Sequence, residues 1–438
     1  MCDELNRILK QRELLFGNQQ CWIINKSNIS GSGVFTNKSY ETGEIIFRDT
    51  PIVIGPRSSV LPPACVSCMK MGVPLITCSK GCRLPVCNSE CENTISHERE
   101  CRLLLEFSVK KGEFWSPLLY RALTALRCLL VSDEEKKLIK CLSANKKTNH
   151  IEMLFLKKEL LKNFSDEEEQ FLNLSCAVLS GTAFETELGE GKIKASLRGL
   201  YPLAGMMNHS CVPNTQHYFL LENNIQTMYV VATCPIPEGM ELTTHYSYLF
   251  WPTIIRRHFL FATKQFWCTC NRCGDPTEFD TNLSALECNC GGLILPLCSI
   301  DMKSDWKCGS CDEVVPASKL PFAKPLEVLN KSETTSGYKM KYFSIIEKFE
   351  QVWSVGHKNT PYEALTDEEL ENKEKITKEL IALNNSLKLG DSRIKGLLSL
   401  ELYDTFKEKI NRNNFIEDEE EIDWVRENAK KILNIAIE

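Results

Sequence analysis

Apolar residues recur at helical spacing over two long stretches of this chain. Between residues 102 and 190, runs such as LLYRALTALRCLL and EEEQFLNLSCAVLS repeat apolar positions every three or four residues, which is the period of an amphipathic helix. The same spacing returns between residues 320 and 438, for example across residues 397–407. We therefore predict a block of helices in the first half of the chain and a small helical bundle at its end.

The pattern near the N-terminus is different. The segment WIINKSNISGSGVFTNKSYETGEIIFRDTPIVIGPR consists of short β-rich runs that are broken at Gly31, Gly33 and Gly43. Glycine pairs of this kind mark turns more often than cofactor sites. Together with the helical blocks, the short β-rich runs predict an α+β fold. A length of 438 residues is enough for two to four domains.

Charge and composition narrow the compartment and the partners. The formal net charge is only −6, so no general electrostatic attraction to nucleic acid or to an acidic membrane is expected. The first residues, MCDELNRILKQRELLFGN, are charged and lack the apolar core of a signal peptide. No uncharged apolar run approaches the length of a membrane span. We expect an intracellular protein, cytoplasmic and/or nuclear.

This placement decides how the 22 cysteines are interpreted. In a reducing compartment, clustered cysteines are metal ligands more often than disulfide partners. Fifteen of the 22 cysteines fall into three short groups when Cys298 is counted with the third. The three groups therefore predict metal sites.

The first group has seven cysteines and one histidine. Its members follow one another at ligand spacing: Cys65, Cys68, Cys78, Cys82, Cys87, Cys91, His97 and Cys101. Eight such ligands make two complete tetrahedral sets, and closed sets of four are structural zinc sites rather than catalytic ones. The spacing predicts two zinc ions but does not say which pairs share an ion.

The second group, Cys268, Cys270 and Cys273, supplies only three thiolates. The fourth zinc position is then filled by a catalytic water or by a ligand from elsewhere in the chain. Cys211, in the segment Asn208-His209-Ser210-Cys211, is the candidate for that ligand.

The third group predicts a small zinc ribbon and hence a fourth zinc ion. Cys288 and Cys290 form one pair and Cys308 and Cys311 the other, on either side of the hairpin-like stretch GGLILPLCSIDMKSDWK. Cys298 lies between the pairs and is a candidate substitute ligand.

Four motifs, taken in order, resemble the SET and MYND domain-containing (Smyd) family of protein lysine methyltransferases over roughly residues 20–315. They are the segment with Gly31-x-Gly33, then GLYPLAGMMNHSCVPNT, EGMELTTHYSY and RRHFLFATKQFWCTCNRC. The first cysteine group resembles a MYND zinc finger inserted after the first strands. The sequence is closest to the arthropod-specific SmydA/msta-like branch in three places: around Ile54–Arg57, around His245-Tyr246, and in the segment GDSRIKGLLSLELYD.

This resemblance implies a split, β-rich SET domain with a MYND insertion, a helical insertion, a post-SET zinc loop and a C-terminal helical domain. The implied boundaries are 1–60 for the N-terminal part of the SET domain, 61–103 for the MYND finger, 104–190 for the helical SET insertion, 191–262 for the C-terminal SET core, 263–315 for the post-SET loop with the ribbon, and 316–438 for the helical domain. It also implies an interleaved MYND finger, with Cys65, Cys68, Cys87 and Cys91 on one zinc and Cys78, Cys82, His97 and Cys101 on the other.

For the chemistry, the resemblance implies S-adenosylmethionine as cofactor and Tyr246 as the catalytic phenol. The implied cofactor contacts are Gly31, Ser32, Gly33, Asn208, His209, Tyr246 and Phe266. Tyr201 and Phe266 are implied to line the lysine channel. A lysine, with a free pKa of about 10.4, must react as a neutral amine, and a narrow apolar channel favours that form.

The sequence departs from the family at three positions and leaves a second hypothesis open. Ser32 replaces the usual basic residue, Thr182 a usual asparagine, and His245 a usual serine. The alternative to a methyltransferase is a catalytically weak or inactive adaptor or transcriptional regulator whose MYND finger binds proline-containing peptides. A sequence-specific DNA-binding zinc finger fits poorly, since the cysteine spacing lacks a recognition helix. We expect a monomer that acts on a lysine-containing protein and binds neither membrane nor nucleic acid.

Overall fold

The computed structural model describes residues 2–15, 21–57, 64–108, 117–142, 150–160, 162–190, 193–320, 340–354, 361–412 and 419–434. The chain forms two compact units, each assembled from separate stretches. Unit 1 contains Met1–Asn37, Ile46–Met207 and His217–Val230, and unit 2 contains Lys38–Ile45, Asn208–Gln216 and Val231–Glu438. Helices and strands occur in both, so the predicted α+β class is confirmed. The six domain boundaries stay predictions.

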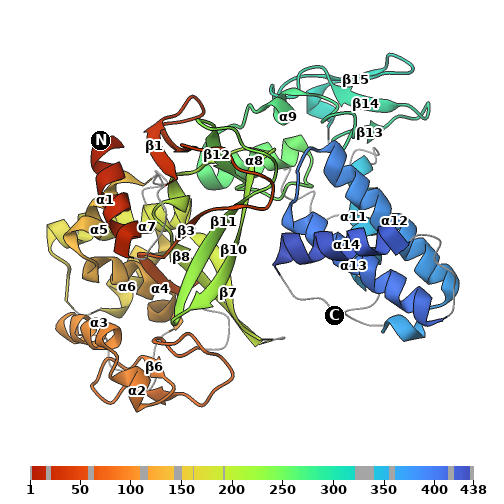
Figure 1. The fold of residues 1–438 in the computed structure, drawn as a ribbon. Helices are drawn as coiled ribbons and strands as arrows, with labels where there is room; N and C mark the ends of the chain where they lie inside the picture. The colour runs from red at the N-terminus through yellow and green to blue at the C-terminus, as the bar shows by residue number, and fades with distance from the viewer. Residues whose placement is uncertain are drawn as a thin grey trace. The chain divides into compact units, whose positions relative to one another are not determined.

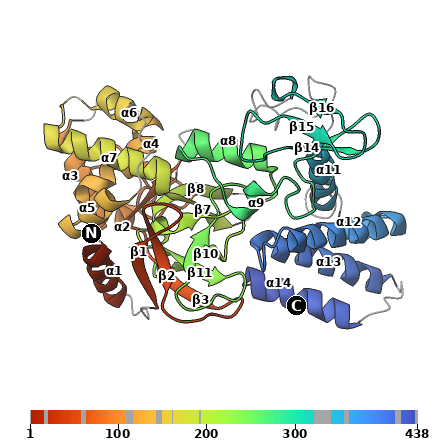
Figure 2. The ribbon, with the colours of Figure 1, turned by 90° about the horizontal axis from the view of Figure 1, so that it is seen from above.

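Unit 1 carries the predicted block of helices (Figures 1 and 2). Its helices are α1 (Cys2–Leu15), α2 (Ser89–Glu92), α3 (Ile95–Glu106), α4 (Pro117–Arg127), α5 (Asp133–Cys141), α6 (Ile151–Glu159) and α7 (Asp166–Thr182). Helices α5 and α7 begin with capping boxes, Ser132 with Glu135 and Ser165 with Glu168. In each box the serine hydroxyl and the glutamate carboxylate satisfy backbone N–H groups that the first helical turn leaves unpaired.

The strands of unit 1 form small sheets. They are β1 (Trp22–Lys26), β2 (Ser32–Thr36), β3 (Ile45–Asp49), β4 (Val53–Pro56), β5 (Ile76–Thr77), β6 (Pro85–Val86), β7 (Phe184–Glu190), β8 (Ile193–Leu200), β10 (Thr215–Glu222) and β11 (Ile225–Ala232), with β3, β10 and β11 lying mostly in this unit. The orders β4-β8-β7 and β10-β11-β3 describe two three-stranded sheets. Strands β1 and β2 pair antiparallel, and Gly31, with φ +52°, lies in the turn that joins them.

A buried carboxylate fixes the segment that leads toward the NHSC motif. Asp49, at the end of β3, accepts hydrogen bonds at 2.8 Å from the backbone N–H groups of both Leu203 and Ala204. Burial raises the pKa of Asp49 to about 7, although these hydrogen bonds and the nearby Arg12 act in the opposite direction. The turn Ala204–Met206 is therefore held to β3 by a buried carboxylate.

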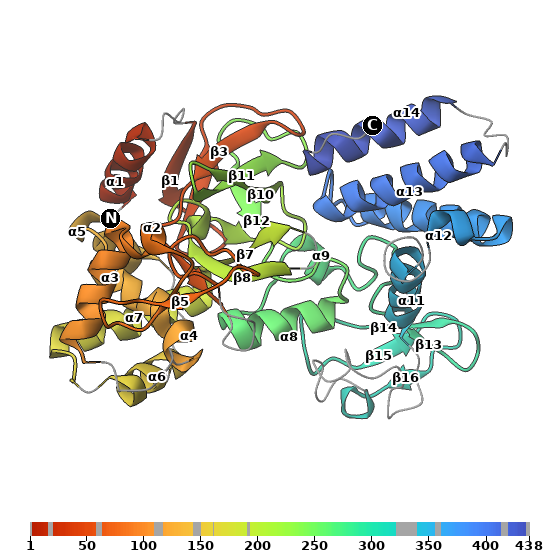
Figure 3. The same cartoon turned by 90° about the horizontal axis from the view of Figure 1, so that it is seen from below.

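Unit 2 combines short strands with the C-terminal helices. Its elements are β9 (Asn208–His209), β12 (Glu241–Thr244), α8 (Thr253–Lys264), α9 (Asn271–Gly274), β13 (Leu286–Glu287), β14 (Leu293–Pro296), β15 (Trp306–Cys308), β16 (Val314–Val315), α11 (Lys341–Ser354), α12 (Asp367–Ser386), α13 (Arg393–Asn411) and α14 (Glu419–Leu433). Helices α12, α13 and α14 lie side by side (Figures 2 and 3), which is the predicted bundle. No helix in the described ranges is long and apolar enough to cross a membrane.

One apolar core joins the strands β13–β16 to the C-terminal helices. The antiparallel order is β13-β14-β15-β16. Trp306 on β15 belongs to the same buried cluster as Phe406 on α13 and Val425 on α14. The sheet is too small to bury its own apolar face, so it depends on these helices.

Gly390 is where the C-terminal helices meet an earlier part of unit 2. The backbone N–H of Asp391 donates to the carbonyl of Thr233 at 2.8 Å, and Asn384 Nδ2 donates to the carbonyl of Gly390 at 3.0 Å. Gly390 has φ +58°, and a Cβ at this position would lie 2.1 Å from the Thr233 oxygen. Only glycine allows both this backbone conformation and this close approach.

We predict that Gly390→Ala lowers the free energy of unfolding by roughly 3 kcal/mol, because backbone strain adds to a steric overlap with backbone. Gly239→Ala is the matched control: Gly239 has φ +79°, but a Cβ there would meet nothing within 4 Å. The control should lose only the backbone strain, about 1–2 kcal/mol. Denaturant unfolding of the two variants measures the difference, and equal losses would contradict the close-approach explanation.

Candidate active site and metal centres

Four groups of side chains bring four ligand atoms each to within 4.8 Å of one another. They are Cys65, Cys68, Cys87 and Cys91; Cys78, Cys82, His97 and Cys101; Cys211, Cys268, Cys270 and Cys273; and Cys288, Cys290, Cys308 and Cys311. The first two sets are the interleaved MYND pairs that the family resemblance implied. In the third set, Cys211 completes the group of three thiolates, so the open position is taken by a protein ligand.

The sulfur separations fit tetrahedral zinc. With Zn–S bonds of about 2.3 Å, neighbouring sulfurs of a tetrahedron lie about 3.8 Å apart. The measured pairs include Cys68–Cys87 at 3.8 Å, Cys78–Cys101 at 3.9 Å, Cys211–Cys273 at 3.6 Å and Cys288–Cys311 at 3.7 Å. All of the cysteines are free thiols rather than disulfide partners. The four groups can therefore each hold one zinc ion.

Helix starts present the ligands of the MYND segment. Thr94 caps α3 by accepting a hydrogen bond from the backbone N–H of His97, and the first turns of α3 then carry both His97 and Cys101. Glu100 Oε2 lies 3.6 Å from His97 Nδ1, and Arg127 Nε donates to Glu100 at 2.8 Å. On the other side of the ring, His97 Nε2 lies 3.8 Å from Cys82 Sγ, so this nitrogen faces the metal position.

Cys298 is not brought into the ribbon site, so its place as a substitute ligand is corrected. Strands β14 and β15 are antiparallel, with Ile294 opposite Cys308 and Pro296 opposite Trp306. Cys298 follows Pro296 and thus lies at the other end of the hairpin from Cys308. It is exposed and lines a cavity of about 490 Å³ together with residues such as His258 and Met302.

The segment that follows α8 carries three ligands of the third zinc group and turns back against that helix. Helix α8 ends at Gln265, whose left-handed conformation (φ +62°) turns the chain into the segment of Phe266 and Cys268. Cys270 precedes the short helix α9, which carries Cys273. Arg257, on α8, donates to the carbonyl of Cys268 at 2.9 Å. The loop is therefore fastened to the helix that precedes it.

An aromatic cluster lies against this zinc group. The ring centroids of His209 and Tyr246 are 5.3 Å apart, those of His209 and Phe266 5.9 Å, and those of Tyr246 and Phe266 6.4 Å in an edge-on arrangement. Tyr246 and Phe266 pack on the buried cluster of Cys211, Leu260, Cys268 and Cys273. Both side chains are half-buried, and Lys264 Nζ lies over the Tyr246 ring, 5.5 Å from its centroid.

Two further groups set the electrostatics of the cluster. Burial, and secondly the carboxylate of Glu241, raise the pKa of Tyr246, so its phenol stays protonated at neutral pH. Asn208 Nδ2 donates to Glu241 Oε1 at 2.7 Å. Strands β9 and β12 pair in parallel, with Asn208 opposite Thr243, which places Asn208 and Glu241 near each other.

The remaining predicted site residues belong to unit 1. Gly31 lies in the β1–β2 turn, Ser32 begins β2 opposite Lys26, and Gly33 is a buried strand residue opposite Asn25. Tyr201 is fully buried, and its hydroxyl donates to the carbonyl of Gln226 at 2.8 Å. These contacts are those of a core residue, and the cofactor and channel roles assigned to this set stay predictions.

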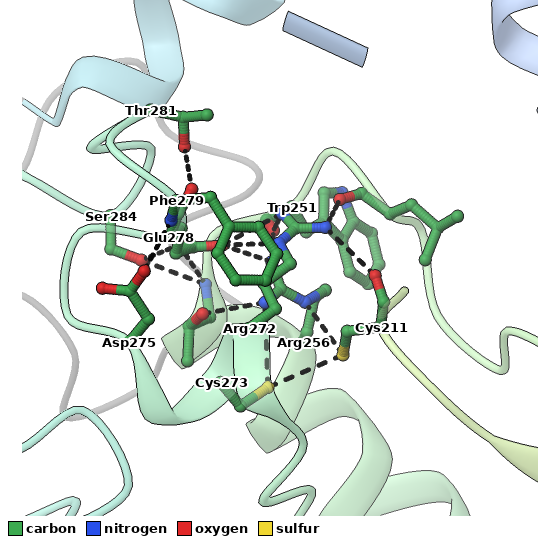
Figure 4. Close-up of polar contacts among 12 residues, drawn as sticks. Cys211, Trp251, Arg256, Arg272, Cys273, Asp275, Glu278, Phe279, Thr281 and Ser284 are labelled. Carbon is green, nitrogen blue, oxygen red and sulfur yellow. Dashed lines mark hydrogen bonds and ion pairs between the residues drawn. The ribbon is translucent and has the colours of Figure 1, made fainter. Parts of the chain in front are cut away.

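The structure adds a buried ionic network that the sequence analysis missed (Figure 4). Arg256, Arg272 and Glu278 are each fully buried. Glu278 Oε2 accepts hydrogen bonds from Arg256 Nη1 at 2.8 Å and from Arg272 Nε at 3.0 Å. Arg256 Nε also reaches Cys211 Sγ at 3.2 Å. The available signal was Arg272, which lies between the predicted ligands Cys270 and Cys273.

This network fixes the charges and the backbone around the zinc group. Burial alone would raise the pKa of Glu278, but Arg256 and Arg272 hold it at about 2. Arg272 Nη1 donates to the carbonyl of Leu249 at 2.6 Å, and Arg256 donates to the carbonyl of Trp251. The two cations outnumber the one carboxylate. The network therefore offsets part of the net negative charge that four thiolates and a zinc ion would carry together.

We predict that Glu278→Gln lowers the free energy of unfolding by about 3–5 kcal/mol, because it leaves two buried guanidinium groups without the carboxylate that they share. The matched control is Glu379→Gln, which removes an ion pair with Lys348. The side chain of Glu379 is 41% exposed and that of Lys348 is 35% exposed. The control should lose less than about 1 kcal/mol. Urea unfolding measures both, and similar losses would contradict the importance of burial.

We also predict four zinc ions per chain. Cys308→Ser should lower the metal content by one ion, because it removes one ligand of a closed set of four. Cys298→Ser is the control and should keep all four ions. Elemental analysis of the purified full chain measures the ratio, and loss of an ion in the control alone would place Cys298 back among the ligands.

Comparisons with known proteins show which family the chain belongs to. The SET domain family matches residues 31–247. SET domain-containing protein SmydA-8, isoform B, of Drosophila melanogaster is 30% identical over 412 residues, or 87% of this chain and 90% of that protein. Histone-lysine N-methyltransferase SMYD3 of Homo sapiens is 26% identical over 264 residues, or 56% of this chain and 59% of that protein.

A solved structure of the SET domain of LSMT bound to lysine and AdoHcy aligns with 99% of this chain and 89% of that one, at a TM-score of 0.31 and 11% identity. The relationship rests on the sequence matches, which extend over almost the whole of SmydA-8. The chain belongs to the SET and MYND domain-containing (Smyd) family, in its arthropod SmydA branch.

Proposed function

We propose that this chain is an S-adenosylmethionine-dependent protein lysine N-methyltransferase. The observation that carries the proposal is the cluster of Tyr246, His209 and Phe266 built directly on the Cys211 zinc group. Relatives named as lysine methyltransferases, including SMYD2 of Gallus gallus at 26% identity over 262 residues, support it.

The residues of unit 2 suit the reaction. When bound, S-adenosylmethionine supplies the methyl group for an in-line displacement by the lysine nitrogen. Half-buried Tyr246 keeps its proton, since burial raises its pKa, and its hydroxyl can orient the nitrogen. Phe266 offers an apolar ring at the same place. An apolar wall disfavours the ammonium form of lysine and so favours the neutral nucleophile.

Asn208 and His209 are the proposed cofactor contacts in unit 2. The bond from Asn208 Nδ2 to Glu241 fixes the plane of the amide. His209 is buried, and β9 pairs with β12 on one side of it. The family resemblance implies that the cofactor contacts Asn208 through its side chain and His209 through its backbone. Alignment of the reacting groups is the main contribution that such fixed residues can make.

The four metal groups fit structural zinc and take no part in the chemistry. Each is a closed set of four protein ligands, so none leaves a position for a reacting water. The Cys211 group lies under Tyr246 and Phe266. Its proposed role is to assemble the wall of the lysine channel.

The second candidate function is a catalytically weak adaptor. Ser32 and Thr182 stand where the family usually has a basic residue and an asparagine, while all four metal groups are complete. Either function involves other proteins: a lysine-containing substrate in the first case, and proline-containing peptides at the MYND segment in both. We further propose a monomer that acts in the cytoplasm, the nucleus or both.

We predict that Tyr246→Phe lowers the rate of transfer of a labelled methyl group to proteins of a cell extract by at least about 100-fold. The variant should still bind the cofactor, since only the hydroxyl is removed. Asn208→Ala should lose cofactor binding. Calorimetry with S-adenosylmethionine and the transfer assay measure the two effects on the zinc-loaded chain. Absence of binding by the unaltered protein would favour the adaptor, and full activity of Tyr246→Phe would remove this residue from the mechanism.

A further inference from the structure

His209 connects the zinc group of unit 2 with the tyrosine beside it. The imidazole is 4% exposed, and both of its nitrogens have partners. Nδ1 accepts a hydrogen bond from the backbone N–H of Tyr246 at 3.0 Å, and Nε2 lies 3.3 Å from Cys211 Sγ. One rigid ring thus lies between a metal ligand and the backbone of the proposed catalytic residue.

The partner of Nδ1 determines where the hydrogen of the ring is. A nitrogen that accepts a bond from a backbone N–H carries no hydrogen itself, so the neutral imidazole of His209 has its hydrogen on Nε2. That N–H faces Cys211 Sγ, which accepts it as a thiolate when it is a metal ligand. The direction of both bonds follows: Tyr246 donates to His209, and His209 donates to Cys211.

A second donor fixes the same sulfur from another side. Arg256 Nε lies 3.2 Å from Cys211 Sγ, and Arg256 is itself held by Glu278 at 2.8 Å. Hydrogen bonds to ligand atoms orient them and contribute to metal affinity. Cys211 is therefore the ligand on which the buried ionic network and the imidazole converge.

We propose that His209 is a positioning residue that couples metal binding at the Cys211 group to the placement of Tyr246, an inference that rests on the role proposed for Tyr246. A metal ion held by Cys211, Cys268, Cys270 and Cys273 would fix the position of Cys211 Sγ. The sulfur fixes the ring of His209, and Nδ1 fixes the backbone N–H of Tyr246. A displaced sulfur would turn the ring and release that N–H.

Two substitutions can separate the bonds because each amide copies one ring nitrogen. In His209→Asn, Oδ1 takes the place of Nδ1 and can still accept from Tyr246, but no group reaches Cys211. In His209→Gln, Nε2 can still donate to Cys211, but the acceptor for Tyr246 is lost. His258→Gln is the control, since His258 is a half-buried residue of α8 whose ring packs on Trp267 at 5.2 Å.

The experiment uses the full chain loaded with cadmium-113, with 3-fluorotyrosine incorporated at position 246. The cadmium resonance of the Cys211 group, assigned through Cys211→Ser, should shift in His209→Asn and stay in place in His209→Gln. The fluorine resonance of residue 246 should behave in the opposite way. Neither should shift in His258→Gln, and the other three cadmium resonances show that each variant is folded.

Shifts of both resonances in both variants, or of neither, would reduce His209 to a space-filling role and overturn the proposal. A measurement without any substitution at His209 guards against a variant that does not fold. Replacing zinc by cadmium lengthens the metal–sulfur bonds, and the fluorine resonance at position 246 should then shift; an unchanged resonance also overturns the coupling.

Activity provides the remaining readout and separates the two proposals. In an active protein, His209→Gln should lower kcat about tenfold or more with KM for the protein substrate within about twofold, and His209→Asn should lower it less. If the unaltered chain transfers no methyl group, the proposed function fails, whereas the cadmium and fluorine resonances still decide whether His209 couples the metal to Tyr246.

Discussion

The buried carboxylate of Glu278 is the interaction on which the centre of unit 2 depends. It is fully buried and accepts hydrogen bonds from two guanidinium groups and from the backbone N–H of Thr253, where α8 begins. Removing three charges from water is costly, and only complete hydrogen bonding offsets that cost. Arg256 and Arg272 therefore have one arrangement open to them, and through it they hold the Cys211 sulfur and the carbonyl of Leu249.

Zinc binding would stabilise the segments of the chain whose apolar cores are small. In the MYND segment, β5 and β6 are two residues long, and the buried apolar cluster nearby consists of Ala64, Met69 and Leu197. Strands of this length bury too little surface to be stable on their own. Metal binding contributes free energy of folding directly. The four short strands of the ribbon likewise bury too little surface by themselves. Their apolar residues pack in one core with the C-terminal helices.

The proposed chemistry uses one physical effect on two groups. Burial disfavours the charged form of any side chain, so it raises the pKa of a phenol and lowers that of an amine. Tyr246 shows the first shift. A lysine placed against Phe266 would undergo the second and would become the neutral nucleophile that methyl transfer requires. Glu241 adds to the shift of Tyr246 and at the same time fixes Asn208.

The sequence by itself determined the secondary structure of the long helical blocks, since periodicity depends only on neighbouring residues. It also indicated four metal sites, since the ligands recur in closely spaced pairs such as Cys65 and Cys68. It could not exclude Cys298, because only the antiparallel register of β14 and β15 separates it from Cys308. Nor could it find the buried network: charged residues lie at the surface by default, and Arg256 and Glu278 are 22 residues apart. The hydrogen of His209 was decided by tertiary structure alone, because its position depends on which backbone N–H the fold brings to Nδ1.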